Sequence, residues 1–415
     1  MTKEKVKMTQ NNKQKCIIYI GDFDLRNQNV QAHLVKNNAK IFNRLGYKIA
    51  FIGENRESSK EKIATLPKQD VGEGNLFLEL ENTLTLKGLL KYRKTAKQIF
   101  AFMDQVAQIY DVKFVISYQA PTYAIILKKV ALWCRQKGAK YIVNSADIPI
   151  LILQPFFRRI AMTLNWKYLH KVNRKYADGL IAVSHYIESF YYKKGMPTIV
   201  LPPLFDDYID KDYELVDRTT FVYAGVPFFF KKNVNTAGMK DRLDKIVDMC
   251  LQLSKENVDY RLLIIGITKD LYNTCIPWHK DALDNNEDII FMGRRSHKDT
   301  LNIVRNADYM INYRDVNIMN MAGVPTKLVE CVSLGTPMVM NSVGDTFLYL
   351  QEGITGYELT GDFVKDVTIL KSLCNYTTEE RMNNKHQCAE EKTFALDNYV
   401  TKLDNFISAV LASRQ

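Results

Sequence analysis

The chain alternates short apolar segments with longer stretches of helical periodicity. Apolar runs of strand length occupy residues 16–21, 47–53, 112–117, 140–145 and 179–184, and helical patterns follow most of them. Near-continuous apolar strands separated by helices are typical of a parallel sheet with both faces covered. The pattern therefore predicts a doubly wound α/β domain in the N-terminal half.

The same alternation restarts in the C-terminal half, after an acidic stretch without apolar period at 204–218. We predict two tandem Rossmann-like domains, over residues 1–205 and 219–390, joined by a linker over 206–218. Ligands of such sheets bind at the carboxyl ends of the strands, so two domains of this kind predict a cleft between them.

Length and composition agree with this organisation. A chain of 415 residues exceeds one ordinary domain, and 47% hydrophobic with 25% charged residues is a globular composition. Seven cysteines without a Cys-x-x-Cys pair predict reduced thiols rather than disulfides or a zinc site.

The net charge of +11 admits nucleic acid, an anionic membrane surface or phosphorylated substrates as partners. No recognised nucleic-acid module is present, so we expect no nucleic-acid partner. The longest apolar run, 148–157, is too short to span a bilayer, and the basic, polar residues 1–15 lack the apolar core of a secretory signal. We therefore expect a cytoplasmic protein.

The segment after Pro325 is the most informative stretch for chemistry. Pro325 favours a helix start, Thr326 is a candidate cap, and Gly335 followed by Pro337 predicts the end. Thr326, Lys327 and Glu330 then share one helix face.

A lysine in a first turn opposes the helix dipole, and a bound anion would remove that conflict. Free backbone N–H groups, a hydroxyl and a lysine make a phosphate site, while Glu330 could accept hydrogen bonds from ribose hydroxyls. The alternative is a capped surface helix whose Lys327 is merely solvated.

Several motifs together resemble retaining glycosyltransferases of the GT-B fold, closest to bacterial polysaccharide-assembly enzymes with a Glu-x7-Glu region. The motifs are P-T-K-x-x-E-x-x-x-x-G-T-P from Pro325, the strand end Tyr313-Arg314, Phe221-Val-Tyr-Ala-Gly225, Lys240-Asp241, Asn341-x-x-Gly344-Asp345 and Gly353-x-x-Gly356. The resemblance covers about residues 178–360 well, and the N-terminal half only in its strand order.

The resemblance implies a nucleotide-diphosphate sugar held mainly by the C-terminal domain and an acceptor held by the N-terminal domain. It implies that Glu330 binds the ribose and that Thr326 and Lys327 face the diphosphate. It also implies that Lys240, at the start of a helix that the pattern predicts over about 240–254, is the catalytic cation, the alternative being a solvated lysine at a helix end. The first glutamate of the motif would fall at Ala322, which leaves the contact to the donor sugar open. The resemblance also implies a final segment, 391–415, that crosses back to the N-terminal domain.

Other candidates follow strands at their expected carboxyl ends. Arg294 and Arg314 are candidate donor-binding cations, each of which could instead be solvated. With them the candidate donor site comprises Gly21, Arg294, Arg314, Pro325, Thr326, Lys327, Glu330 and Asp345. Asp147 is a candidate catalytic residue that orients an acceptor hydroxyl, its alternative being a loop cap.

The motif Asp22-Phe23-Asp24 resembles the metal site of another glycosyltransferase fold, but it follows the first strand of a doubly wound domain. We expect no metal there, and no cofactor beyond the donor substrate.

The basic stretch 157–176 combines an apolar helical stripe with six basic residues and no acid. This pattern is typical of a helix that lies on an anionic membrane, although the stripe could also pack on the sheet while the charges are solvated. The candidate membrane contacts are Arg158, Arg159, Trp166, Lys167 and Lys171.

These observations favour a retaining, metal-independent glycosyltransferase at the inner face of the cell membrane. Its acceptor would be a lipid-linked or polymeric saccharide in surface polysaccharide synthesis. The alternatives are a non-catalytic nucleotide-sugar-binding partner subunit and a sugar-nucleotide epimerase, and the oligomeric state stays open.

Overall fold

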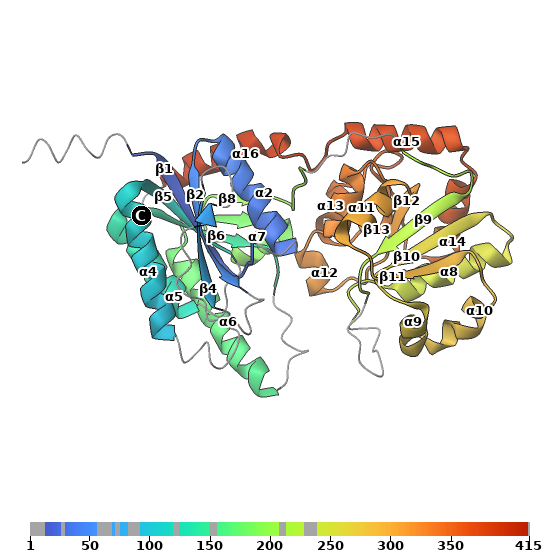
Figure 1. Ribbon diagram of the computed structural model, residues 1–415, viewed down its shortest axis with the longest axis horizontal. Helices are drawn as coiled ribbons and strands as arrows, with labels where there is room; N and C mark the ends of the chain where they lie inside the picture. Colours follow the sequence, from blue (N-terminus) through green and yellow to red (C-terminus); the bar gives the residue numbers. More distant parts are fainter. Residues whose placement is uncertain are drawn as a thin grey trace, which may run out of the picture. The chain divides into compact units, whose positions relative to one another are not determined.

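The computed structural model describes residues 13–25, 30–55, 69–70, 75–81, 92–118, 124–148, 156–206, 213–227 and 239–413. The chain divides into two compact units, Met1–Leu204 with Leu396–Gln415, and Phe205–Ala395 (Figure 1). Each unit has its own mainly parallel sheet with helices on both faces, which confirms the predicted fold class.

The sheet of the first unit has the strand order β3-β4-β2-β1-β5-β6-β7-β8. Its neighbours pair in parallel, apart from the short antiparallel pair β3 and β4. Nearly every residue of the central strands is buried, as expected when helices cover both faces. The strands are β1 (Lys15–Gly21), β2 (Lys48–Asn55), β3 (Gln69–Asp70), β4 (Leu76–Glu81), β5 (Asp111–Tyr118), β6 (Lys140–Ser145), β7 (Gly179–Ala182) and β8 (Thr198–Val200).

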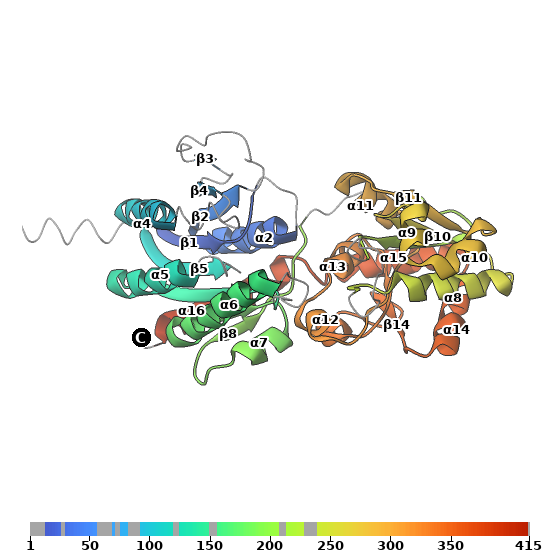
Figure 2. The ribbon, with the colours of Figure 1, turned by 90° about the horizontal axis from the view of Figure 1, so that it is seen from below.

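Two layers of helices cover this first sheet. In Figure 1, α2 and α16 lie on one side of it, whereas α4, α5 and α6 lie on the other, and Figure 2 shows these three side by side. The helices are α2 (Val30–Arg44), α4 (Tyr92–Ile109), α5 (Ala124–Lys137), α6 (Phe156–Tyr176), α7 (His185–Tyr191) and α16 (Asp397–Ala412). The last helix thus completes the first unit, where it packs against α2 and β8.

The sheet of the second unit has the strand order β11-β10-β9-β12-β13-β14. Counted along the chain from β9, this is the order 3-2-1-4-5-6 of dinucleotide-binding folds, and its topological switch point lies between β9 and β12. The strands are β9 (Thr219–Ala224), β10 (Tyr260–Ile265), β11 (Ile289–Gly293), β12 (Tyr309–Asn312), β13 (Met338–Asn341) and β14 (Gly356–Leu359).

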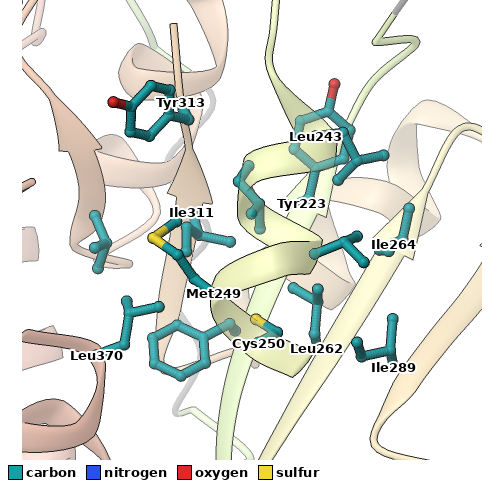
Figure 3. Packing of buried hydrophobic residues seen from close by; sticks show 14 of the residues in the cluster. Tyr223, Leu243, Met249, Cys250, Leu262, Ile264, Ile289, Ile311, Tyr313 and Leu370 are labelled. Atoms are coloured by element: carbon teal, nitrogen blue, oxygen red, sulfur yellow. The ribbon is translucent and has the colours of Figure 1, made fainter. Parts of the chain in front are cut away.

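One core of the second unit lies between its sheet and the helices α8 and α14. Figure 3 shows side chains of α8, β9, β10 and β12 interlocked there, with Tyr223 and Tyr313 at the same end of the packed layer. The helices of this unit are α8 (Leu243–Lys255), α9 (Lys269–Cys275), α10 (Lys280–Asp284), α11 (His297–Arg305), α12 (Ile318–Ala322), α13 (Thr326–Ser333), α14 (Phe363–Cys374) and α15 (Thr378–Glu390), with short 3-10 turns η3 (Pro277–His279) and η4 (Gly344–Leu348).

Of the expected linker, 206–218, the structure describes Asp206 and residues 213–218. These residues belong to the second unit. Arg218 pairs with Asp259 at 2.7 Å and with Asp288 at 2.5 Å, and the backbone N–H of Glu214 donates to Asn306. Across the described part of the chain, no helix combines the length and the apolar character needed to cross a bilayer.

Candidate functional site

The switch point of the second sheet is lined by the segments that follow β9 and β12. Gly225 follows β9 with a φ of +145°, a backbone conformation that side chains with a Cβ rarely adopt. A Cβ at this position would lie 2.6 Å from the Cε and Nζ atoms of Lys327. Glycine therefore lets the strand end lie directly against this ammonium group.

A buried carboxylate, that of Asp241, organises the charges at this point. Its Oδ1 accepts a hydrogen bond from Nε of Arg314 at 2.9 Å, and its Oδ2 accepts from Nζ of Lys327 at 2.5 Å and from the Tyr223 hydroxyl at 3.2 Å. The Lys327 ammonium also lies 4.1 Å from the centre of the Tyr223 ring. We call Tyr223, Asp241, Arg314 and Lys327 the switch-point cluster.

The cluster has one carboxylate and two cations, so it is a net cationic site in a buried place. Burial alone would raise the pKa of Asp241, but Lys327 and Arg314 outweigh it and hold this pKa well below its usual range. Burial lowers the pKa of Lys327, while Asp241 opposes that shift. A further anion beside Lys327 would favour its charged form.

Two asparagines fix the loops that carry the cluster. The side chain of Asn341 accepts from the backbone N–H of Arg314 at 2.8 Å and donates to its carbonyl at 2.7 Å. The fully buried Asn320 donates to the carbonyls of Lys240 at 3.2 Å and Asp315 at 2.9 Å. Sequence reasoning did not single out Asn320, because its partner Lys240 lies 80 residues away along the chain.

Helix α13 presents Lys327 from its first turn, as the sequence predicts. The expectation that Thr326 caps this helix is wrong: Pro325 is the N-cap, no side chain caps the helix, and Thr326 is its first residue. The backbone N–H of Leu328 already donates to the Pro325 carbonyl at 3.1 Å, whereas those of Thr326 and Lys327 have no partners within the helix, so this end can receive an anion. Helix α13 ends before Gly335, which has a φ of +74°.

Glu330 lies one turn further along α13. Burial raises the pKa of its carboxyl to about 7, although Lys327 opposes the shift. Among the described residues its carboxyl has no hydrogen bond or ion pair. It can therefore accept hydrogen bonds from a hydroxyl-bearing ligand.

Lys240 does not open a helix, contrary to the expectation, because α8 begins at Leu243. Residues 240–242 form the preceding turn, where the backbone N–H of Arg242 donates to the Tyr313 carbonyl at 2.8 Å. The Lys240 side chain is exposed, and its charge contributes to lowering the pKa of Lys327. Asp241, the residue next to it, takes the central position in the cluster instead.

A cavity of about 330 Å³ opens at the carboxyl ends of β12, β13 and β14 and shares Arg314 with the cluster. Asn341, Ser342 and Thr360 supply polar groups to its wall. Asp345 is buried in η4, which packs against α12. Arg294 lies outside this group, exposed at the end of the edge strand β11.

The candidates of the first unit also lie at carboxyl ends of strands. Gly21 ends β1 at the switch point with β5, and a Cβ there would lie 2.2 Å from the Tyr118 carbonyl oxygen. Asp147 is exposed two residues beyond β6. Asp22 and Asp24 follow β1, and no three His, Cys, Asp or Glu side chains group as metal ligands within the described ranges.

The candidate membrane residues all belong to α6. Lys167 and Lys171 are exposed, Arg159 is half-buried, and the side chain of Arg158 is outside the described set. Trp166 is half-buried, and its ring packs 5.6 Å from Phe190 and 5.9 Å from His170, centre to centre.

No protein-family model and no curated protein matches the chain. The sucrose-phosphate synthase of Thermosynechococcus elongatus is similar in structure, with a TM-score of 0.63 at 13% identity over 97% of this chain and 100% of that one.

Two further structures are similar to this degree. The catalytic domain of starch synthase IV from Arabidopsis thaliana, bound to ADP and acarbose, has a TM-score of 0.64 at 8% identity over 97% of this chain and 100% of its own. HepE of Anabaena, in complex with UDP, has a TM-score of 0.60 at 10% identity over 95% and 99%. The chain has the GT-B fold. At these identities the similarity shows the fold alone.

Proposed function

We propose that this chain is a glycosyltransferase that takes a sugar from a nucleotide-diphosphate donor. The observation that carries the proposal is the switch-point cluster, in which Arg314 and Lys327 share one buried carboxylate, Asp241, where β9 and β12 diverge. Doubly wound sheets bind nucleotides at this point, and a diphosphate matches the excess positive charge.

The cluster suits the main task of sugar transfer from such a donor. As the bond from the anomeric carbon to the phosphate oxygen breaks, negative charge grows on the departing nucleotide diphosphate. Cations held in place beforehand stabilise that charge without reorganisation. We assign this role to Lys327 and Arg314, with the exposed Lys240 as a third cation, so the reaction needs no metal.

The positions of the neighbouring residues on α13 suggest how the ribose and the diphosphate of the donor are bound. Glu330 is proposed to accept hydrogen bonds from the ribose hydroxyls, and the first turn of α13 at Thr326 to face the diphosphate. HepE was solved with UDP and with UDP-glucose, and starch synthase IV with ADP, so the proposal leaves the base of the donor open.

We further propose retention of the anomeric configuration. In a front-face substitution the departing phosphate would take the proton of the acceptor hydroxyl while cations hold the phosphate, which requires positioning more than a strong base. Asp147 in the first unit is proposed to orient that hydroxyl. The proposed acceptor is a lipid-linked or polymeric saccharide of surface polysaccharide synthesis, reached at the cytoplasmic face of the membrane.

A non-catalytic partner subunit is the second candidate, and one observation favours it. Ala322 is fully buried where the resemblance expects a carboxylate against the donor sugar. Such a subunit would bind a nucleotide sugar without releasing nucleotide diphosphate.

The test is release of nucleotide diphosphate from UDP-, ADP- and GDP-sugars, with and without membrane extract as a source of acceptor. We expect release with one of these donors, stimulated by extract, and loss of about 10²–10³ in rate for Lys327→Met, as when one transition-state donor is removed. The matched control is Lys255→Met, an exposed lysine in the last turn of α8. Binding without release would favour the partner subunit, and an epimerised free donor would favour an epimerase.

A further inference from the structure

The outer surface of the helices α4, α5 and α6 is basic across all three helices. Every charged residue of α5 and of α6 is a lysine or an arginine. The only acid of α4 is Asp104, which is held by Lys137 of α5 at 3.2 Å and by the Trp133 indole at 2.9 Å. The charge therefore extends over a whole helical layer, of which α6 is one part.

Large apolar side chains are exposed on the same layer. On α6, Phe157 is 85% exposed and Leu164 64%, and Phe156 and Ile160 are exposed beside them. On the adjacent α5, Ile125 is 53% exposed and Leu132 lies two turns further along the same face. Apolar groups grouped within a basic surface are typical of contact with a lipid interface rather than with water.

The layer on the opposite face of the same sheet serves as an internal comparison. Helix α2 carries three basic residues and no acid, but α16 carries Asp397 and Asp404 as well as Lys402, and Arg44 of α2 pairs with Asp397. The large apolar residues exposed on α2 and α16 lie at helix ends: Val30 begins α2, and Leu411 is in the last turn of α16. The basic, apolar character is thus a property of one face of the unit.

We propose that the outer surface of α4, α5 and α6 docks on an anionic lipid bilayer. This inference rests on the membrane attachment contained in the proposed function, and it assigns that attachment to a whole layer instead of one helix. Lysines and arginines, such as Lys129 and Lys167, attract the anionic headgroups, and Phe157, Leu164 and Ile125 enter the interface. The half-buried Trp166, which packs on Phe190, is not needed for this contact.

Charge complementarity decides the occupant. A soluble polyanion would match the lysines but would leave Phe157 and Leu164 in water, whereas an anionic bilayer satisfies both groups. Each basic residue near an anionic surface adds about 1 kcal/mol of attraction, screened by salt, while the apolar contribution persists at high salt.

The test is co-sedimentation of the full chain with vesicles, without any donor sugar. The vesicles are equimolar phosphatidylglycerol and phosphatidylcholine, or phosphatidylcholine alone. The apolar variants are Phe157→Ser with Leu164→Ser on α6, and Ile125→Ser with Leu132→Ser on α5. The charge variant is Lys129→Gln with Lys167→Gln. The matched controls on the opposite layer are Val30→Ser with Leu411→Ser, and Lys36→Gln with Lys402→Gln, all exposed.

We expect binding to the anionic vesicles only, and a partition coefficient about thirtyfold lower for the charge variant, which lacks two basic residues. Each apolar pair, on α5 as well as on α6, should lower it severalfold, and both controls should bind like the original chain. Circular dichroism melting of every variant separates loss of binding from loss of fold.

Three results would overturn the proposal. They are unchanged binding of the α5 pair, equal binding to both kinds of vesicle, and a change in oligomeric state of the serine variants by light scattering, which would make this face a contact between copies. Because no donor takes part, these results are independent of nucleotide release. Vesicle binding without any release would instead contradict the proposed function alone.

Discussion

The two sheets share one strand order around their first strand but differ in what stands at the switch point. In the first unit, Gly21 lies tightly against Tyr118, and the backbone N–H of Asp22 donates to the Tyr118 carbonyl at 3.2 Å. In the second unit, the corresponding Gly225 faces the Lys327 ammonium. The strand order gives the same switch point twice, but among the described residues largely buried cations lie beside the second one only.

The sign of the nearby charges points the same way. Asp22, Asp24 and Asp147 follow strands of the first sheet, whereas Arg314 and Lys327 lie at the ends of the second. The proposed anionic donor would meet these two cations at the switch point of the second sheet. The comparison supports placing the proposed donor site in the second unit because of its side chains rather than its fold.

Removing the central carboxylate should have the largest effect on stability. Asp241→Asn leaves Arg314 and Lys327 without their shared counter-charge, at a cost of about 3–5 kcal/mol in the free energy of unfolding. Because its pKa is lowered in the folded chain, Asp241 stabilises at neutral pH, and this contribution is lost as the pH falls below about 4.

Urea unfolding measures this loss, and added pyrophosphate should restore stability to the variant more than to the original chain. The control is Asp397→Asn, which removes the exposed pair with Arg44 and should leave the urea midpoint unchanged. Equal midpoints for both variants would mean that Asp241 does not hold the two cations.

Alanine substitutions at the two switch-point glycines should have different effects, on stability at Gly21 and on donor binding at Gly225. Gly21→Ala forces a Cβ against a backbone oxygen and should cost about 3 kcal/mol of stability. Gly225→Ala meets the end of a flexible lysine, so it should cost about 1–2 kcal/mol, mostly for its positive φ, while moving Lys327 and raising the KM for the donor. Thermal melting and donor titration measure the two effects. A normal donor KM in the alanine variant at 225 would contradict the assigned role of Lys327.

Glu330 should make stability depend on pH. Its folded pKa is raised from 4.5 to about 7, so its contribution is fully present below pH 4.5 and is lost as the pH rises through 7. The loss should be about 3 kcal/mol, and Glu330→Gln should remove it, because the amide stays neutral. Urea unfolding of both proteins from pH 4.5 to 8 measures the difference. Parallel curves would show that the pKa of Glu330 is not raised in the folded chain.

The alternation of strands and helices could be predicted from the sequence because buried parallel strands are apolar along their whole length. The strand β4, Leu76–Glu81, was missed, since its apolar residues alternate with charged ones and it adjoins a long stretch without apolar period. The start of α8 was placed too early, because Asn320 and Asp241 hold residues 240–242 in a turn through tertiary contacts.

The sequence predicts those residues of the site that can be recognised from one local motif each. Lys327 and Arg314 were found from their positions at a helix start and a strand end. The central place of Asp241 was not, because its partners lie 73 and 86 residues away along the chain. The sequence did offer one indication of its role. Asp241 directly follows Lys240, and a single acid among cations that are expected to bind phosphate is a candidate for an ion pair with one of them.

The most direct test of the central claim is calorimetric binding of nucleoside diphosphates to the original chain and to Lys327→Met, with Lys255→Met as the control. We predict that one nucleoside diphosphate binds, that Lys327→Met weakens its binding by about tenfold or more, as expected for a lost charge-assisted hydrogen bond, and that Lys255→Met changes nothing. Equal affinity in all three proteins would contradict the assignment of the donor diphosphate to the switch point of the second sheet.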